Sequence, residues 1–255
     1  AASNSRIKRL VQLNQKSKLR RTEDVFLAEG VKMFLEAPRE QLQEVYVSES
    51  FLEKCSCREH LEEVGYEVVS DSVFSKISDT CTPQGVLCVL KQFHYNIEEM
   101  RRDKAPLFLL LENIQDPGNL GTMLRTGEGA GVSGIIMSRD TVDLYNPKVI
   151  RSTMGSIYRV PFYYADDFAA AVHQVQQAGV SVYAAHLRGK NSYACQDYTK
   201  GTAFLIGNEG NGLREETAEL ADCYIRIPME GKVESLNAAV ASSILMYEAH
   251  RQRAI

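Results

Sequence analysis

The sequence contains no tryptophan, no apolar run of membrane-spanning length and no Cys-x-x-Cys motif. A helix needs roughly 18 consecutive apolar residues to cross a bilayer, so we expect no membrane-spanning segment. The first residues are polar and basic and lack the apolar stretch of a secretory signal, so none is predicted. These absences favour a protein that works in water, and we expect a cytoplasmic location without a membrane partner.

Metal-binding patterns are also missing. Cys55 and Cys57 are too close in sequence for an ordinary disulfide and have no second pair of ligands for zinc. No histidine has a partner at metal-ligand spacing, although His186 follows a predicted strand and could line a pocket. We therefore predict no metal site, and reduced cysteines fit a reducing compartment.

The charge is unevenly distributed. A net charge of −4 argues weakly against nucleic-acid binding, but the stretch 1–22 carries seven cations and its first acid is Glu23. This run fits either a solvated helix face or an arm that contacts RNA phosphates. Under the second interpretation the contacting residues are Arg9, Lys18, Arg20 and Arg21.

A chain of 255 residues predicts two domains. The first, 1–95, starts with an amphipathic helix over 5–19 that carries most of the basic run. Alternating patterns then predict strands at 45–47, 66–69 and 86–90 and helices at 50–64 and 72–77, which make a compact α/β module. The polar stretch 96–104 is predicted to be a linker, and 105–255 the second domain.

The second domain is predicted to be a parallel sheet with helices between its strands. The strands fall at 107–111, 135–138, 160–164, 180–185, 203–206 and 224–227, and the helices at 117–130, 147–155, 166–178 and after Ser235. Because knotted chains are rare, these rules alone predict an unknotted Rossmann-like sheet.

A literal Gly-x-Gly-x-x-Gly occurs at 129–134. A dinucleotide-binding loop must follow a strand and open a helix, whereas here a helix precedes the glycines and a strand follows. We interpret them as a helix end and a tight turn, which counts against a nucleotide-binding dehydrogenase.

Two strand ends and the start of one helix predict the functional site. The strands 203–206 and 224–227 each end in bend-forming residues, and Ser235 can cap the long helix that follows. Ligands bind at the carboxyl ends of strands in open α/β sheets. Asn119 and Arg125 follow another strand, and they could be a helix start with a surface arginine or a polar pair directed into the same crevice.

Three motifs in this region resemble those of the SpoU (TrmH-type) RNA 2′-O-ribose methyltransferases of the SPOUT superfamily. They are Asn119-Leu120-Gly121 with Arg125, then Asn208-Glu209, then Ser235-Leu236-Asn237. Before them, FLAEGVKM and TPQGVLCVL resemble the family's substrate-binding domain. The resemblance implies an α/β knot, a deep trefoil with a mostly parallel sheet, preceded by a small α/β RNA-binding domain.

The resemblance also implies a function and a set of site residues. It implies S-adenosylmethionine-dependent methylation of a ribose 2′-hydroxyl by a homodimer that packs through the catalytic domain, with ribosomal RNA as first choice of substrate and tRNA as the alternative. A non-catalytic RNA-binding or assembly factor is a rival. The implied cofactor contacts are Gly207, Ile227 and Leu236, with Asn208, Met229 and Asn237 close by. The implied catalytic residues are Arg125, Asn119, Glu209, Ser235 and Asn237.

The resemblance leaves the chemical role of Arg125 open. A guanidinium normally stays charged in proteins. Either burial converts Arg125 into a base, or it stabilises the developing alkoxide and an adjacent phosphate. The second role is favoured on chemical grounds.

Overall fold

The computed structural model describes residues 5–254 and divides them into two compact units. Unit 1 comprises 5–93 with 143–158, and unit 2 comprises 94–142 with the chain from 159 onward. The outermost residues of the two predicted domains, 1–4 and 255, lie outside the described residues. None of the helices within 5–254 has the length and apolar character needed to cross a bilayer.

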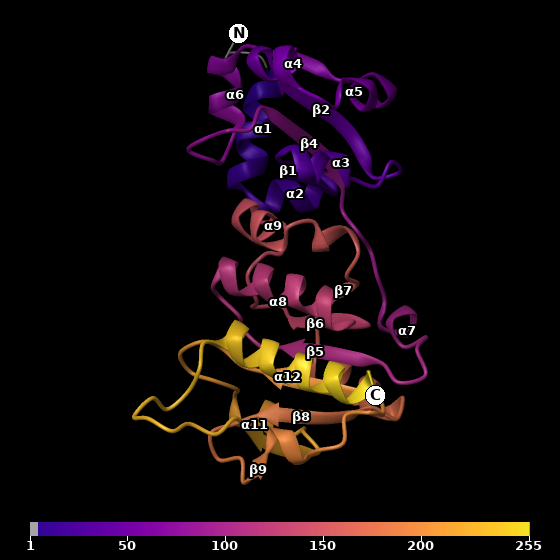
Figure 1. The fold of residues 1–255 in the computed structure, drawn as a ribbon, viewed down its shortest axis with the longest axis vertical. Helices are drawn as coiled ribbons and strands as arrows, with labels where there is room; N and C mark the ends of the chain where they lie inside the picture. Colours follow the sequence, from indigo (N-terminus) through magenta and orange to yellow (C-terminus); the bar gives the residue numbers. More distant parts are fainter. Residues whose placement is uncertain (1–4, 255) are drawn as a thin grey trace. The chain divides into compact units, whose positions relative to one another are not determined.

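Unit 1 is a four-stranded mixed sheet with helices on both faces (Figure 1). The strand order is β1-β4-β2-β3, with β4 antiparallel to both β1 and β2 and β3 parallel to β2. The strands are β1 (Val25–Glu29), β2 (Leu42–Ser48), β3 (Glu67–Val69) and β4 (Val86–Lys91). The helices are α1 (Ser5–Gln15), α2 (Ser17–Glu23), α3 (Val31–Leu35), α4 (Glu49–Lys54), α5 (Arg58–Val64), α6 (Asp71–Ile77), α9 (Pro147–Thr153) and the short 3₁₀ helix η1 (Ser156–Tyr158).

The predicted N-terminal helix is present, with Ile7, Leu10 and Leu13 buried against the sheet. The single helix predicted over 50–64 is wrong, because α4 and α5 are separated at 55–57, where Cys57 turns into the interior. Strand β1 was not predicted at all. The first four of its five residues are apolar and buried. The sequence of β1 therefore lacks the alternation of apolar and polar residues on which strand prediction relied.

Arg20 lies inside unit 1 and is not a surface cation. Its side chain is 3% exposed, and its guanidinium donates hydrogen bonds to the carbonyl oxygens of Leu13 (2.6 Å) and Asn14 (3.1 Å) and to Asp143 Oδ2 (2.6 Å). The prediction that Arg20 contacts RNA is therefore wrong. It holds the turn between α1 and α2 to the segment that contains Asp143.

The other predicted RNA contacts differ in exposure. Arg9 is half-buried and forms ion pairs with Glu23 (2.6 Å) and Glu44 (2.8 Å), so its charge is already compensated. Lys18 and Arg21 are exposed on α2. The basic run therefore serves two purposes, because some of its cations hold the unit together and others face solvent.

Unit 2 is built on a seven-stranded sheet in the order β7-β6-β5-β10-β8-β11-β9, and every neighbouring pair of strands is parallel. Its strands are β5 (Leu107–Leu111), β6 (Gly134–Ser138), β7 (Phe162–Ala165), β8 (Ser181–Ala185), β9 (Asn191–Ser192), β10 (Thr202–Ile206) and β11 (Cys223–Arg226). Its helices are α7 (Ile97–Met100), α8 (Pro117–Ala130), α10 (Phe168–Gln177), α11 (Glu215–Ala218), α12 (Ala238–Arg253) and the 3₁₀ helix η2 (Tyr193–Cys195). The predicted α/β class with a parallel sheet is confirmed.

Helices cover both faces of this sheet. On one face α8 and α12 pack against each other, and α12 also contacts the central strand β10 (Figure 1). On the other face Phe108 and Leu110 of β5 share a buried cluster with residues of α7 and α10. Successive residues of a strand point to opposite faces, so the fully apolar β5 is buried on both sides, as its composition predicts.

Two segments differ from the predicted organisation. The predicted linker 96–104 contains α7, which is capped by Asn96 and Glu99 and buries Ile97 and Met100 in the core of unit 2. The segment 143–158 follows β6 in sequence but packs within unit 1, where α9 contacts β1. Neither placement is encoded in the local pattern of polar and apolar residues.

The glycine string at 129–134 has the structural role expected of it. Helix α8 ends at Ala130, Gly131 adopts the left-handed conformation with φ +78°, and β6 begins at Gly134. Gly129 leaves room for the Tyr247 side chain of α12, since a Cβ there would lie 2.8 Å from the Tyr247 hydroxyl. No helix follows these glycines that could receive a pyrophosphate.

The environment of Arg20 makes a prediction about stability. Arg20→Ala should lower the free energy of unfolding by about 3 kcal/mol, because it leaves the Asp143 carboxylate and two carbonyl groups without their partner. The exposed neighbour Arg21 provides the control, and Arg21→Ala should change the same quantity by less than about 0.5 kcal/mol. Urea unfolding of both variants checks this, and equal effects would contradict the placement of Arg20.

Candidate functional site

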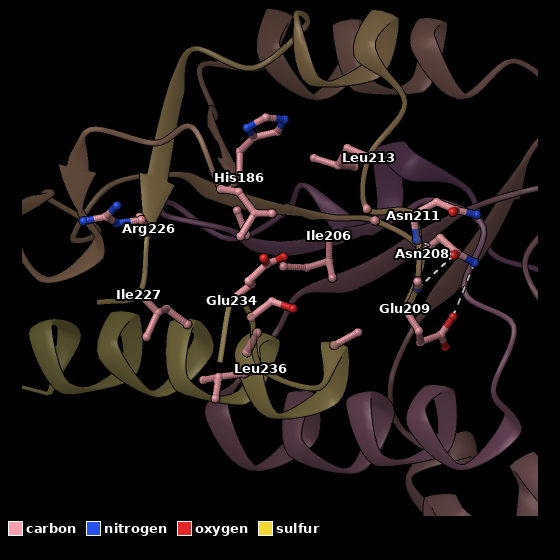
Figure 2. Close-up of a pocket in the computed structure, with 18 of the residues that line it drawn as sticks. His186, Ile206, Asn208, Glu209, Asn211, Leu213, Arg226, Ile227, Glu234 and Leu236 are labelled. Carbon is pink, nitrogen blue, oxygen red and sulfur yellow. Dashed lines mark hydrogen bonds between the residues drawn. The ribbon is translucent and has the colours of Figure 1, made fainter. Parts of the chain in front are cut away.

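A cavity of about 260 Å³ opens at the carboxyl ends of β8, β10 and β11 in unit 2. Its walls come from these strand ends, from the loop 207–213 after β10 and from the segment that leads into α12 (Figure 2). All three strands run in the same direction, so their carboxyl ends meet at one edge of the sheet.

Most of the residues expected to bind a cofactor line this cavity. They are Gly207, Asn208, Ile227, Met229 and Leu236. Figure 2 shows Ile227 and Leu236 on one side of the space and Asn208 at one end. Asn237 does not line the cavity, although its neighbours Leu236 and Ala238 do.

Gly207 is required by the path of the chain itself. A Cβ at this position would lie far inside van der Waals distance of the Gly212 carbonyl carbon and the Leu213 backbone nitrogen. Asn208 and Gly212 exchange backbone hydrogen bonds (3.1 and 2.9 Å), which closes the loop into a tight turn. The backbone that crowds Gly207 therefore belongs to the chain itself.

Asn208 fixes this loop to the neighbouring strand end. Its Nδ2 donates to the carbonyl oxygen of Asn113, just after β5 (2.8 Å), while its Oδ1 accepts from the backbone N–H groups of Gly210 and Asn211 (both 3.0 Å). Both ends of the amide are therefore engaged. Asn208 shapes the wall of the cavity.

The Glu209 carboxylate joins the same loop to the start of α8. It accepts hydrogen bonds from the backbone N–H groups of Gln115 (3.1 Å) and Asp116 (3.0 Å) and from Asn119 Nδ2 (3.1 Å). Burial alone would raise the pKa of Glu209, but these donors outweigh it and hold the pKa below its ordinary value. Glu209 is thus an ionised structural acceptor and a poor proton acceptor at neutral pH.

Asn119 extends the network to the last helix. Its Oδ1 accepts a hydrogen bond from Asn237 Nδ2 (3.0 Å), and Asn237 Oδ1 in turn accepts from the N–H groups of Ala239 (2.8 Å) and Val240 (3.2 Å). Asn237 is therefore the N-cap of α12, and the prediction that Ser235 caps this helix is wrong. Ser235 instead lies in the exposed segment before the helix and lines the cavity.

Arg125 stands apart from this network. It is exposed on α8, does not line the cavity, and its side chain has no hydrogen bond or ion pair within the described part of the chain. Arg125 lies six positions after Asn119, so at 100° per residue the two side chains leave the helix in different directions. The structure thus brings Asn119, Glu209 and Asn237 together, and it leaves Arg125 outside their contacts.

The strand end after β8 contributes residues that the motifs did not reveal. Ala185, His186 and Leu187 line the cavity. His186 stacks on Tyr224 with ring centroids 4.9 Å apart, and its Nδ1 accepts the Arg188 N–H (3.1 Å). Burial, with the nearby Arg188 charge, lowers the pKa of His186, so the ring is neutral at pH 7. The strand predicted at 180–185 allowed His186 to line a pocket, and the structure confirms this prediction.

The chemistry of the cavity suits a ligand with a flat apolar part. Ile206, Ile227 and Leu236 supply apolar surface, while every residue of the bent loop 207–213 lines the cavity. The Glu209 carboxylate and the Asn119 amide are already hydrogen-bonded to other groups of the protein. The site can therefore bind and orient a ligand, and a proton-transferring group has to come from outside this network.

Comparison with known proteins places these features in a family. Residues 106–247 match the SpoU rRNA Methylase family, and residues 4–88 match the MRM3-like substrate binding domain. The chain is similar to the 23S rRNA (guanosine(2553)-2′-O)-methyltransferase RlmP of Bacillus subtilis, with 32% identity over 97% of this chain and 96% of that protein.

Solved structures agree with the sequence comparison. The AdoMet-bound rRNA methyltransferase of Sinorhizobium meliloti is 31% identical and superposes with a TM-score of 0.84 over 98% of this chain and 96% of that chain. The SpoU methyltransferase AviRb of Streptomyces viridochromogenes, in complex with AdoMet, is 26% identical, with a TM-score of 0.89 over 98% of both chains. The similarity covers both units.

The crowding at Gly207 makes a prediction about the loop. Gly207→Ala should lower the free energy of unfolding by about 2–3 kcal/mol, because the backbone at 212–213 must move to accept a methyl group. Gly210→Ala in the same loop is the matched control, since a Cβ there meets nothing closer than Asn208 Oδ1 at 3.7 Å. Thermal unfolding compares the two, and an undisturbed Gly207→Ala protein would contradict this account.

Proposed function

Because the chain belongs to the SpoU rRNA methylase family, we propose that it transfers a methyl group from S-adenosylmethionine to a ribose 2′-hydroxyl of ribosomal RNA. The observation that carries this proposal is the cavity at the ends of the parallel strands, bounded by the loop 207–213 and the segment before α12. Glu209, Asn119 and Asn237 tie these two segments to the start of α8, so that all three motifs meet at one place.

The lining of the cavity fits the proposed cofactor. Ile227 and Leu236 offer apolar surface to an adenine ring, and the loop 207–213 lines the cavity along its whole length. Asn208 and Met229 complete the wall. When bound, S-adenosylmethionine supplies a methyl carbon that its sulfonium already activates. The protein then has to place the ribose hydroxyl in line and assist the loss of its proton.

Arg125 is the residue that we assign to the hydroxyl. Arg125 is exposed and acts by stabilising the developing alkoxide and holding the adjacent phosphate, the role that the chemistry of a guanidinium favours. Glu209, Asn119 and Asn237 position the loops, and Ser235 borders the cavity that they enclose. The lowered pKa of Glu209 argues against its being the general base.

We further propose a homodimer that packs through unit 2. Val240 and Tyr247 on α12 are 48% exposed, an apolar surface that a second copy could cover. The position of Arg125 outside the cavity of its own chain also fits a site completed across such a dimer. We infer the trefoil knot from the family as well, and the packing of α12 beside both α8 and the central strand β10 is compatible with it.

Unit 1 is proposed to bind the RNA. Its match to the MRM3-like substrate binding domain supports this role, and Lys18 and Arg21 offer exposed cations. The likeness to RlmP along nearly the whole chain makes ribosomal RNA the first choice of substrate and tRNA the alternative. We also propose a cytoplasmic location. The six free cysteines support this location, because thiols stay reduced there.

Titration and turnover test the reaction. The protein should bind S-adenosylmethionine and not NAD, and it should methylate ribosomal RNA transcripts in preference to tRNA. Arg125→Ala should reduce kcat at least about 100-fold with unchanged cofactor affinity, because Arg125 lies outside the cavity. Binding of neither cofactor, or normal turnover of the variant, would contradict the proposed reaction or the role of Arg125 respectively. Methylation of tRNA alone would replace the substrate.

The salt dependence of RNA binding tests the basic surface of unit 1. Replacing both Lys18 and Arg21 by Gln should weaken binding and reduce the slope of log K against log salt concentration by about 1.4–1.8, if each residue contacts one phosphate. Replacing Lys54 and Lys76, two exposed lysines of the same unit, removes the same charge and is the control. Equal slopes for both double variants would show that Lys18 and Arg21 do not contact RNA phosphates.

A further inference from the structure

A buried carboxylate lies directly behind the loop of the cavity. Glu112 follows β5 and is 2% exposed. It accepts hydrogen bonds from the Arg214 backbone N–H (2.8 Å), from Arg214 Nη1 (3.3 Å) and from the Thr217 hydroxyl (2.5 Å). Its own N–H donates to the carbonyl oxygen of Ile206, the last residue of β10 (2.9 Å). Glu112 thus contacts the chain on both sides of the loop 207–213.

Arg214 connects this carboxylate to a second strand end. Its guanidinium reaches from Glu112 to Asp140, which follows β6. Burial alone would raise the pKa of Asp140, but the Ser138 hydroxyl and Arg214 hold it below its ordinary value. Asp140 is therefore ionised at neutral pH, and one guanidinium bridges two carboxylates. An arginine fork can do this, whereas a lysine ammonium has a single centre.

These contacts hold the loop at the end that the motif residues do not reach. Asn208 and Glu209 fix the first part of the loop to the segment after β5 and to the start of α8. Arg214 directly follows the last loop residue, Leu213, which lines the cavity. Between these attachments the chain has to make the crowded turn at Gly207.

We propose that Glu112 and Arg214 are positioning residues for cofactor binding, acting through the loop 207–213. The inference rests on the proposed function, because it assigns these residues to the same cavity. A buried carboxylate that loses its charged partner carries a large desolvation penalty. The buried Glu112 carboxyl group accepts from both the backbone N–H and the side chain of Arg214, so it constrains where Arg214 can lie and, with it, the end of the loop. Neither residue lines the cavity.

Arg214→Gln tests the proposal with two readouts on the full chain. The variant should raise the Kd for S-adenosylmethionine about tenfold, as expected when one charged hydrogen bond that supports the loop is lost. Amide hydrogen exchange at 207–213 should become faster even without cofactor. Arg214→Lys should recover only part of the affinity, because it restores the charge without the fork.

Two further variants separate positioning from general destabilisation. Thr217→Val removes one hydrogen bond to the Glu112 carboxylate and leaves the ion pair, so it should lower the thermal midpoint with less effect on cofactor affinity. Arg159→Gln removes an ion pair with Glu128 elsewhere in unit 2 and should change neither loop exchange nor affinity. If Arg214→Gln, Arg214→Lys and Thr217→Val all weaken binding only in proportion to lost stability, the positioning role is overturned.

The outcomes also distinguish this proposal from the proposed function. If the unmodified protein fails to bind S-adenosylmethionine, the proposed function fails, and the positioning role in cofactor binding fails with it. If the unmodified protein binds S-adenosylmethionine, and Arg214→Gln binds it equally well with unchanged amide hydrogen exchange at 207–213, only the positioning role fails. Faster exchange together with weaker binding, beyond what the matched controls show, supports it.

Discussion

The hydrogen bonds of the Glu209 carboxylate are the interaction on which the site depends. Glu209 belongs to the loop after β10, yet its partners are the backbone and side chain at the start of α8, about 90 residues earlier in sequence. Asn119 passes the connection on to the N-cap of α12. Three segments that are remote in the chain are thereby fixed around one cavity. A carboxylate with this many hydrogen-bond donors does not accept a proton easily. The role of Glu209 is therefore to hold these segments in position.

This arrangement fits a reaction in which position matters more than acid–base chemistry. A methyl group on a sulfonium is already activated, so an enzyme can gain most of its rate by aligning the hydroxyl and stabilising the charge that develops. The network accordingly uses amides, backbone groups and one ionised carboxylate to hold loops in place. Glu112 and Arg214 continue the same strategy one layer further from the cavity. Arg125 remains exposed, where substrate RNA can reach it.

Charge in this protein has to be interpreted residue by residue. Arg20 and Arg21 are neighbours in one basic run, but the first is buried against Asp143 and the second faces solvent. The difference arises because adjacent residues of a helix point in directions 100° apart, so only one of them can face the interior. Arg9 is likewise occupied by two glutamates, whereas Lys18 is exposed. The net charge of −4 therefore does not tell which cations are buried or paired and which face solvent.

Sequence alone determined the α/β class and a parallel sheet, because apolar runs and bend-forming residues act over a few neighbours, and the three motifs supplied much of the cavity wall through their resemblance to the family. Gly207, Ile227 and Leu236 were named from the resemblance to the family, and Gly207 and Ile227 directly follow β10 and β11, where the strand ends predict the site. Only the tertiary structure decided that Asn237 and not Ser235 caps α12, that Arg20 is buried and that 143–158 packs within unit 1. These outcomes depend on partners distant in the chain, such as Asn119 for Asn237 and Asp143 for Arg20, and no local pattern encodes such a partner.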